Sequence, residues 1–461
     1  MEEVEAEIME PFEIHYSDLV LLSSSSRISS YSKEELSRLE SISETIMQTL
    51  GPSGPGLLAV TGVPRGCELR RTLLPLARKL SLLNNEDRRR ILNEHRLGTD
   101  VSLKNPDRTV SSFTLQLKYL QEPSLNCSFD GSIHGAENNT EEQPDVERFD
   151  EFQDNEFKNL GSTFKELGFC MMETGLQLAR ICDKAIGGQE LEQSILESCA
   201  AKGRLIHYHS TLDNLALKEA VRRKQSTKGI TSYRFKLPKE PRESELRNRE
   251  EKISIEASNL DTSLNGARSC RTSLSNLWQQ WHYDYGIFTV LTTPMFMSSC
   301  DPLTTEAKEQ ECRPPDGHIY LQIFDANKNK ILVVRSPPDS FIVQVGESAA
   351  ILSKGKLHST LHSVCRPEKL KNLSRETFVV FLQPAWDKTF SISQYSRENA
   401  ISESIMRLPH VAEQERHILS QEIHNIVPPL SSRLKDGMTF AEFSRQTTKQ
   451  YYGGSGMQSK R

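Results

Sequence analysis

Residues 281–291 read WHYDYGIFTVL and form the most informative run of the chain. The apolar and β-branched residues of its second half are typical of a strand. Side chains two positions apart on a strand project to the same face, so His282 and Asp284 are expected to point together. The run therefore predicts a strand that aims an imidazole and a carboxylate at one point.

Further strand-like segments follow this run towards the C-terminus. Residues 325–329, DANKN, predict a hairpin turn between two of them. Because no helical pattern separates these strands, we expect an antiparallel barrel or jelly roll and not a parallel βαβ sheet. The predicted strands are His282–Leu291, His318–Phe324, Ile331–Val334, Phe341–Val345 and Thr377–Leu382.

The first half of the chain is predicted to be mostly helical. Ser32 and Glu35 form a capping box that starts one helix. Three further elements follow from the spacing of apolar residues. They are a short buried strand at Leu57–Val63, a helix at Leu69–Leu83 that contains Pro75, and a long amphipathic helix over 157–185.

The composition indicates that polar insertions dilute the folded part. Hydrophobic residues make up 36% of the 461, and the mean hydropathy is −0.52, both low for a globular chain. Residues 218–252 hold 18 charged residues, 12 of them basic, and predict an unstructured insertion. We expect a mostly helical N-terminal region at 12–211, the charged insertion at 212–276, a jelly-roll core at 277–396, and a helical segment with a frayed tail at 397–461.

Charge and cysteine content limit the binding partners and the cellular compartment that we expect. A net charge of −5 gives no general reason to expect a nucleic-acid or membrane partner, although the basic residues of 218–252 could recruit a nucleic acid or a protein. Nine cysteines without CxxC spacing indicate reduced thiols. The chain has neither a signal-peptide pattern nor an apolar run of about 20 residues. We expect a cytoplasmic monomer, with a nuclear location as the alternative.

A third metal ligand is expected about one barrel traverse downstream of Asp284. Residues 354–364 read KGKLHSTLHSV and offer two histidines, His358 and His362. Two histidines and one carboxylate on one face form the facial triad of non-haem Fe(II) oxygenases, which leaves coordination positions open. A catalytic zinc ion uses the same ligand types and stays an alternative.

A second pair with two-residue spacing, Arg375 and Thr377, lies in RETFVVFLQP at 375–384. A guanidinium beside a hydroxyl suits a co-substrate that carries a carboxylate, because the guanidinium donates two parallel hydrogen bonds. The pair predicts an anion subsite near the metal.

The order and spacing of these motifs resemble the plant-type 2-oxoglutarate- and Fe(II)-dependent oxygenases related to isopenicillin N synthase. The resemblance extends from Phe12 to Ser396. It implies an α+β fold, with a double-stranded β-helix (jelly roll) and helices packed outside it. It also implies Fe(II) as the metal, 2-oxoglutarate as co-substrate, and hydroxylation or desaturation of an organic substrate with release of succinate and CO2.

Carried over to this chain, the resemblance implies that His282, Asp284 and His362 hold the iron. His362 is preferred to His358 because Lys354-Gly355 aligns with the family's Asn-Gly turn, seven residues before the ligand.

The resemblance also assigns the residues around the co-substrate. Arg375 and Thr377 match the Arg-x-Ser pair that grips the distal carboxylate of 2-oxoglutarate. Tyr208, in RLIHYHS, matches a tyrosine that contacts the same molecule. Phe381 corresponds to an aromatic residue that stacks on the substrate, and a packing role in the core is its alternative. The chain departs from the family pattern at Ile206, His209, Glu347 and Ser363.

Two other classes of function stay open. One is a jelly-roll protein that binds or regulates without catalysis. The other is an oxygenase that acts on a macromolecule through the basic insertion. A small-molecule substrate is favoured over both.

Overall fold

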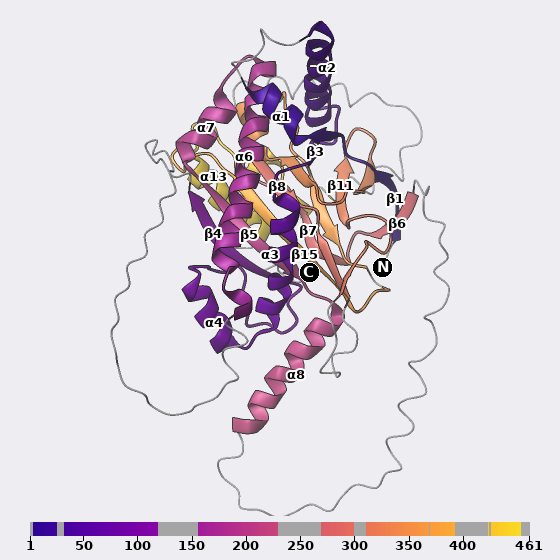
Figure 1. Cartoon of the computed structure of the whole chain (residues 1–461), viewed down its shortest axis with the longest axis vertical. Helices are drawn as coiled ribbons and strands as arrows, with labels where there is room; N and C mark the ends of the chain where they lie inside the picture. Colours follow the sequence, from indigo (N-terminus) through magenta and orange to yellow (C-terminus); the bar gives the residue numbers. More distant parts are fainter. Residues whose placement is uncertain are drawn as a thin grey trace, which may run out of the picture.

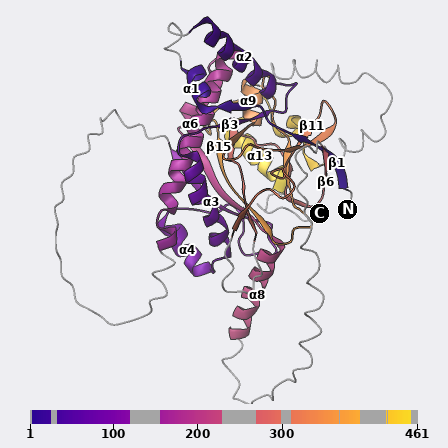
Figure 2. The same ribbon diagram turned by 45° about the vertical axis from the view of Figure 1, so that its right-hand side comes forward.

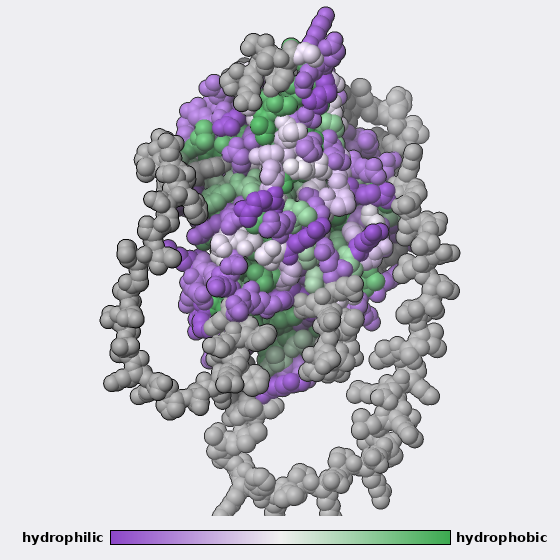
Figure 3. All heavy atoms as spheres, in the orientation of Figure 1, coloured by the Kyte–Doolittle hydropathy of each residue, from purple (hydrophilic) through white to green (hydrophobic). Residues whose placement is uncertain are grey.

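The computed structural model describes residues 3–24, 32–118, 155–228, 269–298, 310–367, 369–391, 423 and 426–452. Two β-sheets lie at the centre, and helices α3 (Gly66–Leu82) and α6 (Leu160–Ile186) cover one side of them, whereas α8 (Thr211–Lys228) projects away (Figures 1 and 2). On the face drawn in Figure 3, hydrophilic residues predominate and apolar residues lie in smaller areas between them. No helix among the described residues is both long enough and apolar enough to cross a membrane.

The smaller sheet has six strands in the order β6-β1-β12-β11-β14-β7. The hairpin between β11 and β12 is the predicted one, with Asp325 opposite Lys330 across the turn. Strand β1 is not predicted by the sequence pattern; it pairs with β12 in parallel and with β6 in antiparallel orientation. The strands are β1 Glu3–Met9, β6 Ser269–Ser273, β7 Leu277–His282, β11 Leu321–Asp325, β12 Lys330–Val334 and β14 His362–Cys365.

The larger sheet runs β10-β9-β15-β8-β13-β3-β2, and β5 and β4 extend it beyond β15. Strand β15 is long enough to pair with β5 on one side and with both β8 and β9 on the other. The strands are β2 Glu13–His15, β3 Leu57–Thr61, β4 Val110–Lys118, β5 Ala200–Tyr208, β8 Phe288–Thr292, β9 Met295–Ser298, β10 Gln310–Cys312, β13 Phe341–Val345 and β15 Leu373–Leu382.

The helices mostly precede the jelly roll, as the sequence predicts. Ser32 caps α2, because its Oγ accepts a hydrogen bond from the backbone N–H of Glu35 at 3.2 Å. Helix α3 tolerates Pro75 in its interior. The helices are α1 Tyr16–Ser23, α2 Lys33–Leu50, α3 Gly66–Leu82, α4 Asn85–Glu94, α6 Leu160–Ile186, α7 Glu190–Ser198, α8 Thr211–Lys228, α9 Glu347–Leu352, α12 Leu430–Arg433 and α13 Phe440–Tyr452.

Two apolar cores flank the larger sheet. Its outer face packs against α3 and α6, with residues such as Phe164, Leu178 and Phe378 fully buried. Its inner face packs against the smaller sheet through a second cluster that includes Trp278 and Leu332. The packing gives the jelly roll expected from the sequence: two curved sheets with a narrow space between them, and helices outside.

The predicted unstructured insertion at 212–276 is wrong at both ends. Helix α8 starts at Thr211, and the buried carboxylate of Asp213 in its first turn accepts hydrogen bonds from Arg78 at 2.8 and 3.1 Å. The other end forms β6, the edge strand of the smaller sheet, which pairs with β1. These contacts are polar or backbone-mediated, so apolar periodicity could not predict them. Residues 229–268 lie outside the described part.

Candidate functional site

Three side chains converge between the two sheets. His282 ends β7 and His362 starts β14, and the two residues are direct cross-strand partners with ring centroids 4.3 Å apart. Asp284 lies in the loop after β7, with its carboxylate oxygens 3.7 Å from His282 Nε2 and 3.8 Å from His362 Nε2. The three ligand atoms lie within 4.8 Å of one another. His358 is not in this group.

Asp284 reaches this position for a different reason from the one predicted. Strand β7 stops at His282, so strand alternation alone does not orient the aspartate. Instead the backbone carbonyl of Asp284 accepts a hydrogen bond from the N–H of Glu347 at 2.8 Å, and Thr289 Oγ1 donates to Asp284 Oδ2 at 2.6 Å. The loop and its neighbours on α9 and β8 therefore orient the carboxylate.

Hydrogen bonds on the far side of each ring orient the two histidines. His282 Nδ1 donates to the carbonyl of Gln280 at 2.7 Å, and His362 Nδ1 donates to that of Thr360 at 3.0 Å. Each Nε2 is then unprotonated, which is the tautomer that a metal requires. Burial, followed by the nearby His362, lowers the pKa of His282 to about 4, so this ring is neutral at pH 7.

A second buried cluster, formed by His207, His209 and Asp213, has the same residue types in similar proximity. Its charge environment is different, because Arg78 already forms an ion pair with Asp213 at 2.8 Å. Burial, His207 and nearby arginines hold the pKa of His209 well below its usual range. The positive charge of Arg78 beside Asp213 opposes the binding of a dication in this cluster. Asp284, in contrast, has no Lys or Arg ion-pair partner among the described residues.

A narrow inner cavity leads from the triad between the sheets, and Arg375, Thr377 and Tyr208 line it. The guanidinium of Arg375 is 1% exposed, donates through Nε to the carbonyl of Ile319 at 3.2 Å, and lies 5.1 Å from the Tyr208 ring centroid. Within the described chain, Arg375 forms no ion pair with a carboxylate. A buried cation without a counter-ion is costly, so this subsite suits an anionic ligand. Thr377 Oγ1 instead donates to the carbonyl of Thr292 at 3.3 Å.

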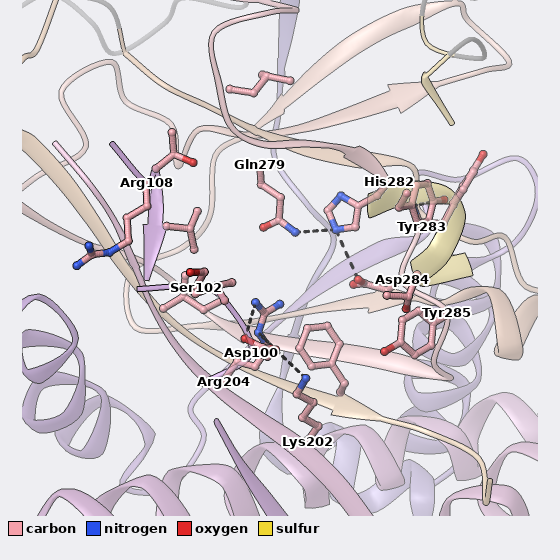
Figure 4. Close-up of a pocket in the computed structure, with 18 of the residues that line it drawn as sticks. Asp100, Ser102, Arg108, Lys202, Arg204, Gln279, His282, Tyr283, Asp284 and Tyr285 are labelled. Atoms are coloured by element: carbon pink, nitrogen blue, oxygen red, sulfur yellow. Dashed lines mark hydrogen bonds and ion pairs between the residues drawn. The ribbon is translucent and has the colours of Figure 1, made fainter. Parts of the chain in front are cut away.

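A larger outer cavity of about 620 Å³ opens beside the triad (Figure 4). Phe381 lines both cavities, and the Arg204 guanidinium lies 5.9 Å from its ring centroid. Asp100 accepts hydrogen bonds from Lys202 at 2.7 Å and from Arg204 at 3.3 Å across the floor of the cavity. The cavity therefore combines an aromatic wall with a charged cluster.

The C-terminal helix α13 contributes another wall, which the sequence analysis does not predict. Tyr451 lines the outer cavity, and its hydroxyl accepts a hydrogen bond from the backbone N–H of Tyr283 at 3.2 Å. Arg433 on α12 binds Glu347 with two hydrogen bonds, one of 2.7 Å, in a fully buried ion pair. In the sequence, Glu347 is notable only as a departure from the family pattern. Its partner lies 86 residues away, so no local signal could identify the pair.

Gln279 and Thr289 are the other site residues that the sequence analysis misses. Gln279 Nε2 donates to His282 Nε2 at 2.9 Å, while its Oε1 accepts from the Tyr208 hydroxyl at 2.8 Å. Gln279 therefore links the triad to the co-substrate side of the inner cavity. Its position three residues before His282 is the one available signal.

Comparison with known proteins agrees with this geometry. Residues 316–384 match the model of the 2OG-Fe(II) oxygenase superfamily. No curated protein matches the chain.

Three solved structures illustrate the weak likeness at the level of the whole chain. A full-length Neurospora crassa protein in complex with alpha-KG and 5-formyluracil is 12% identical, with a TM-score of 0.43 over 95% of this chain and 94% of that one. JOX2 in complex with 2OG, Fe and JA is 13% identical, with a TM-score of 0.42 over 84% and 78%. The dioxygenase for auxin oxidation from rice is 13% identical, with a TM-score of 0.43 over 86% and 96%. Likeness at this level assigns no substrate.

The matched segment contains strands β11 to β15 and, within them, His362, Arg375 and Thr377. It thus contains strands β11, β13, β14 and β15, which contribute residues to the inner cavity. Over residues 316–384 the chain is similar to the 2OG-Fe(II) oxygenase superfamily, and this match together with the group His282, Asp284 and His362 supports a dioxygenase that uses Fe(II) and 2-oxoglutarate.

Proposed function

We propose that His282, Asp284 and His362 hold the Fe(II) ion, and that Arg375, Thr377 and Tyr208 bind 2-oxoglutarate in the inner cavity. The donor set fits the metal, since both Nε2 atoms and the carboxylate face one point and no cation among the described residues competes for Asp284. Iron with 2-oxoglutarate supplies O2-dependent oxidation of a C–H bond, with succinate and CO2 as products.

The observation that carries this proposal is the buried guanidinium of Arg375 in the same cavity as the triad. A carboxylate there would give Arg375 the partner that the described protein residues do not supply. Thr377 stands two residues further along β15 and lines the same cavity. Gln279 holds the Tyr208 ring in place, so the aromatic face stays under the guanidinium.

We further propose that the primary substrate is a small organic molecule that binds in the outer cavity against Phe381. A volume of about 620 Å³ lies in the usual range for small-molecule sites. The Asp100–Lys202–Arg204 cluster and Tyr451 would orient the polar groups of that substrate. Among the described residues of the basic segment 218–252, none lines either cavity, which gives the macromolecular alternative no support.

The test of the co-substrate site is a titration of the iron-loaded protein with 2-oxoglutarate in the absence of O2. Charge-assisted hydrogen bonds contribute about 1.5–3 kcal/mol each, so Arg375→Gln should raise Kd by about a hundredfold or more. Arg375→Lys keeps the positive charge but cannot donate two parallel hydrogen bonds, so its Kd should lie between those of the parent and Arg375→Gln. Fe(II) affinity is the control and should hardly change. An unchanged Kd in Arg375→Gln would overturn the assignment.

A screen of metabolites for stimulated succinate formation would test the substrate class. We expect one or more small molecules to stimulate succinate formation, and we expect a smaller stimulation in Phe381→Ala. A response only to a protein or nucleic acid would contradict it.

A further inference from the structure

Gln344 is a buried amide whose side-chain nitrogen, Nε2, has no hydrogen-bond partner among the described residues. It lies on β13, at the centre of the larger sheet, with 2% of its surface exposed. Leaving a buried amide N–H unpaired costs about 1–3 kcal/mol, so such atoms in native proteins usually have a partner. The side chain lines the inner cavity, which identifies where that partner would lie.

The register of the sheet shows which end of the inner cavity Gln344 occupies. Gln344 is the direct cross-strand partner of Thr289 on β8, and Thr289 is the partner of Phe381 on β15. The hydroxyl of Thr289 donates to Asp284, so this row of residues lies at the level of the triad. Arg375 lies six residues before Phe381 on β15, towards the other end. Gln344 therefore belongs to the metal end of the cavity.

We propose that Gln344 binds the 2-oxo acid end of 2-oxoglutarate, by donating a hydrogen bond from Nε2 to one of its oxygens. This inference rests on the proposed co-substrate site and extends it. Arg375 and Gln344 then hold opposite ends of one dianionic molecule, the first through charge and the second through a neutral donor. A neutral donor suits the metal end, because a second cation there would oppose binding of Fe(II).

The primary substrate is the less suitable partner for Gln344. The side chain lines the inner cavity, together with Arg375 and Thr377, but is absent from the lining of the outer one. The two cavities adjoin, since His282, Asp284 and Phe381 line both, but Gln344 lies on the inner side.

The experiment measures 2-oxoglutarate affinity anaerobically in the Fe(II)-loaded full chain. Gln344→Leu removes the donor at nearly constant volume and should raise Kd about tenfold or more, with Fe(II) affinity alone unchanged. The matched control is Gln322→Leu on β11, a glutamine with 0% exposure that lines neither cavity and donates to the carbonyl of Ser273. This control should leave Kd unchanged, whatever it does to stability.

A second variant tests whether Gln344 acts as a hydrogen-bond donor, and it remains informative if Gln344→Leu fails to fold. Gln344→Glu keeps the shape but places a carboxylate next to an anionic ligand at pH 7, so it should weaken binding more than Gln344→Leu. Lowering the pH protonates the new carboxyl and restores a hydrogen-bond donor. The Kd of Gln344→Glu for 2-oxoglutarate should then move closer to that of the parent. Gln344→Leu should show no such change.

The outcomes separate this inference from the proposed function. A parent protein that does not bind 2-oxoglutarate defeats the proposed function itself. A parent that binds it with the same Kd as Gln344→Leu overturns the role of Gln344 alone. An equal loss in Gln344→Leu and Gln322→Leu also overturns it, since the loss would then come from packing.

Discussion

Thr289 is the residue that fixes one oxygen of Asp284, through a 2.6 Å hydrogen bond from its hydroxyl. Such partners of metal ligands typically change metal affinity by about 10- to 100-fold when removed. Thr289→Val keeps the shape of the side chain on β8 and should weaken Fe(II) binding by about that factor, as measured by anaerobic metal titration.

The control for Thr289 lies three residues along the same strand. Thr292 is equally buried, but its hydroxyl accepts a hydrogen bond from the backbone N–H of Phe378 and does not contact the triad. Thr292→Val should therefore lower stability without changing Fe(II) affinity. Equal affinities in Thr289→Val and the parent would show that the loop alone orients Asp284.

At the scale of elements, helix α9 connects the triad to the C-terminal segment. Its first residue, Glu347, donates its backbone N–H to the carbonyl of Asp284, while its carboxylate binds Arg433 on α12. Removing one partner of a buried ion pair leaves an unpaired charge, which costs about 3–5 kcal/mol. Arg433→Met should destabilise the chain by about this amount in urea unfolding.

The double variant Arg433→Met with Glu347→Leu separates charge from packing. Because both charges are gone, it should recover most of the lost stability. If the double variant is as unstable as Arg433→Met, the loss of stability comes from lost packing and not from an unpaired charge.

Elements with a local signal could be predicted from the sequence, and those made by distant pairing could not. The capping box at Ser32, the apolar stripe of α6 and the turn at Asp325 each act within a few residues, and the structure contains all three elements. Strands β1 and β6 have weak patterns of their own; β1 is stabilised by pairing with β12 and β6, and β6 by pairing with β1.

The same distinction applies to the site. His282 and Asp284 could be selected because the two residues lie close in the sequence, and the third histidine because of its surrounding motif. Gln344, Thr289 and Arg433 act across strands or helices, so only the three-dimensional register identifies them.

On the scale of the whole molecule, buried histidines should make the protein sensitive to acid. Burial lowers the pKa of His318 to about 4, and it also lowers the pKa values of His209, His282 and His358. A histidine with a usual pKa near 6.5 binds protons more readily in the unfolded chain, so stability is lost as the pH falls below about 6.5. The free energy of unfolding of the metal-free protein should decrease steadily between about pH 6.5 and pH 4.

His318 allows this effect to be measured away from the triad. Its Nδ1 accepts a hydrogen bond from the backbone N–H of Tyr320 at 3.2 Å, and the side-chain oxygen of an asparagine could accept the same bond. The free energy of unfolding of His318→Asn should therefore decrease by about 3 kcal/mol less than that of the parent over this pH range, as measured by urea unfolding at each pH. Identical pH profiles in variant and parent would contradict the burial argument.

The central claim, that His282, Asp284 and His362 form an iron site that accepts 2-oxoglutarate, is tested most directly by optical titration without O2. The protein should bind one Fe(II), and added 2-oxoglutarate should give a weak visible charge-transfer band. His282→Ala and His362→Ala should each abolish this band, and His358→Ala should leave it in place, since His358 lies outside the triad. A parent protein that binds neither iron nor 2-oxoglutarate at millimolar concentration, or a band that survives in His362→Ala, would contradict the account.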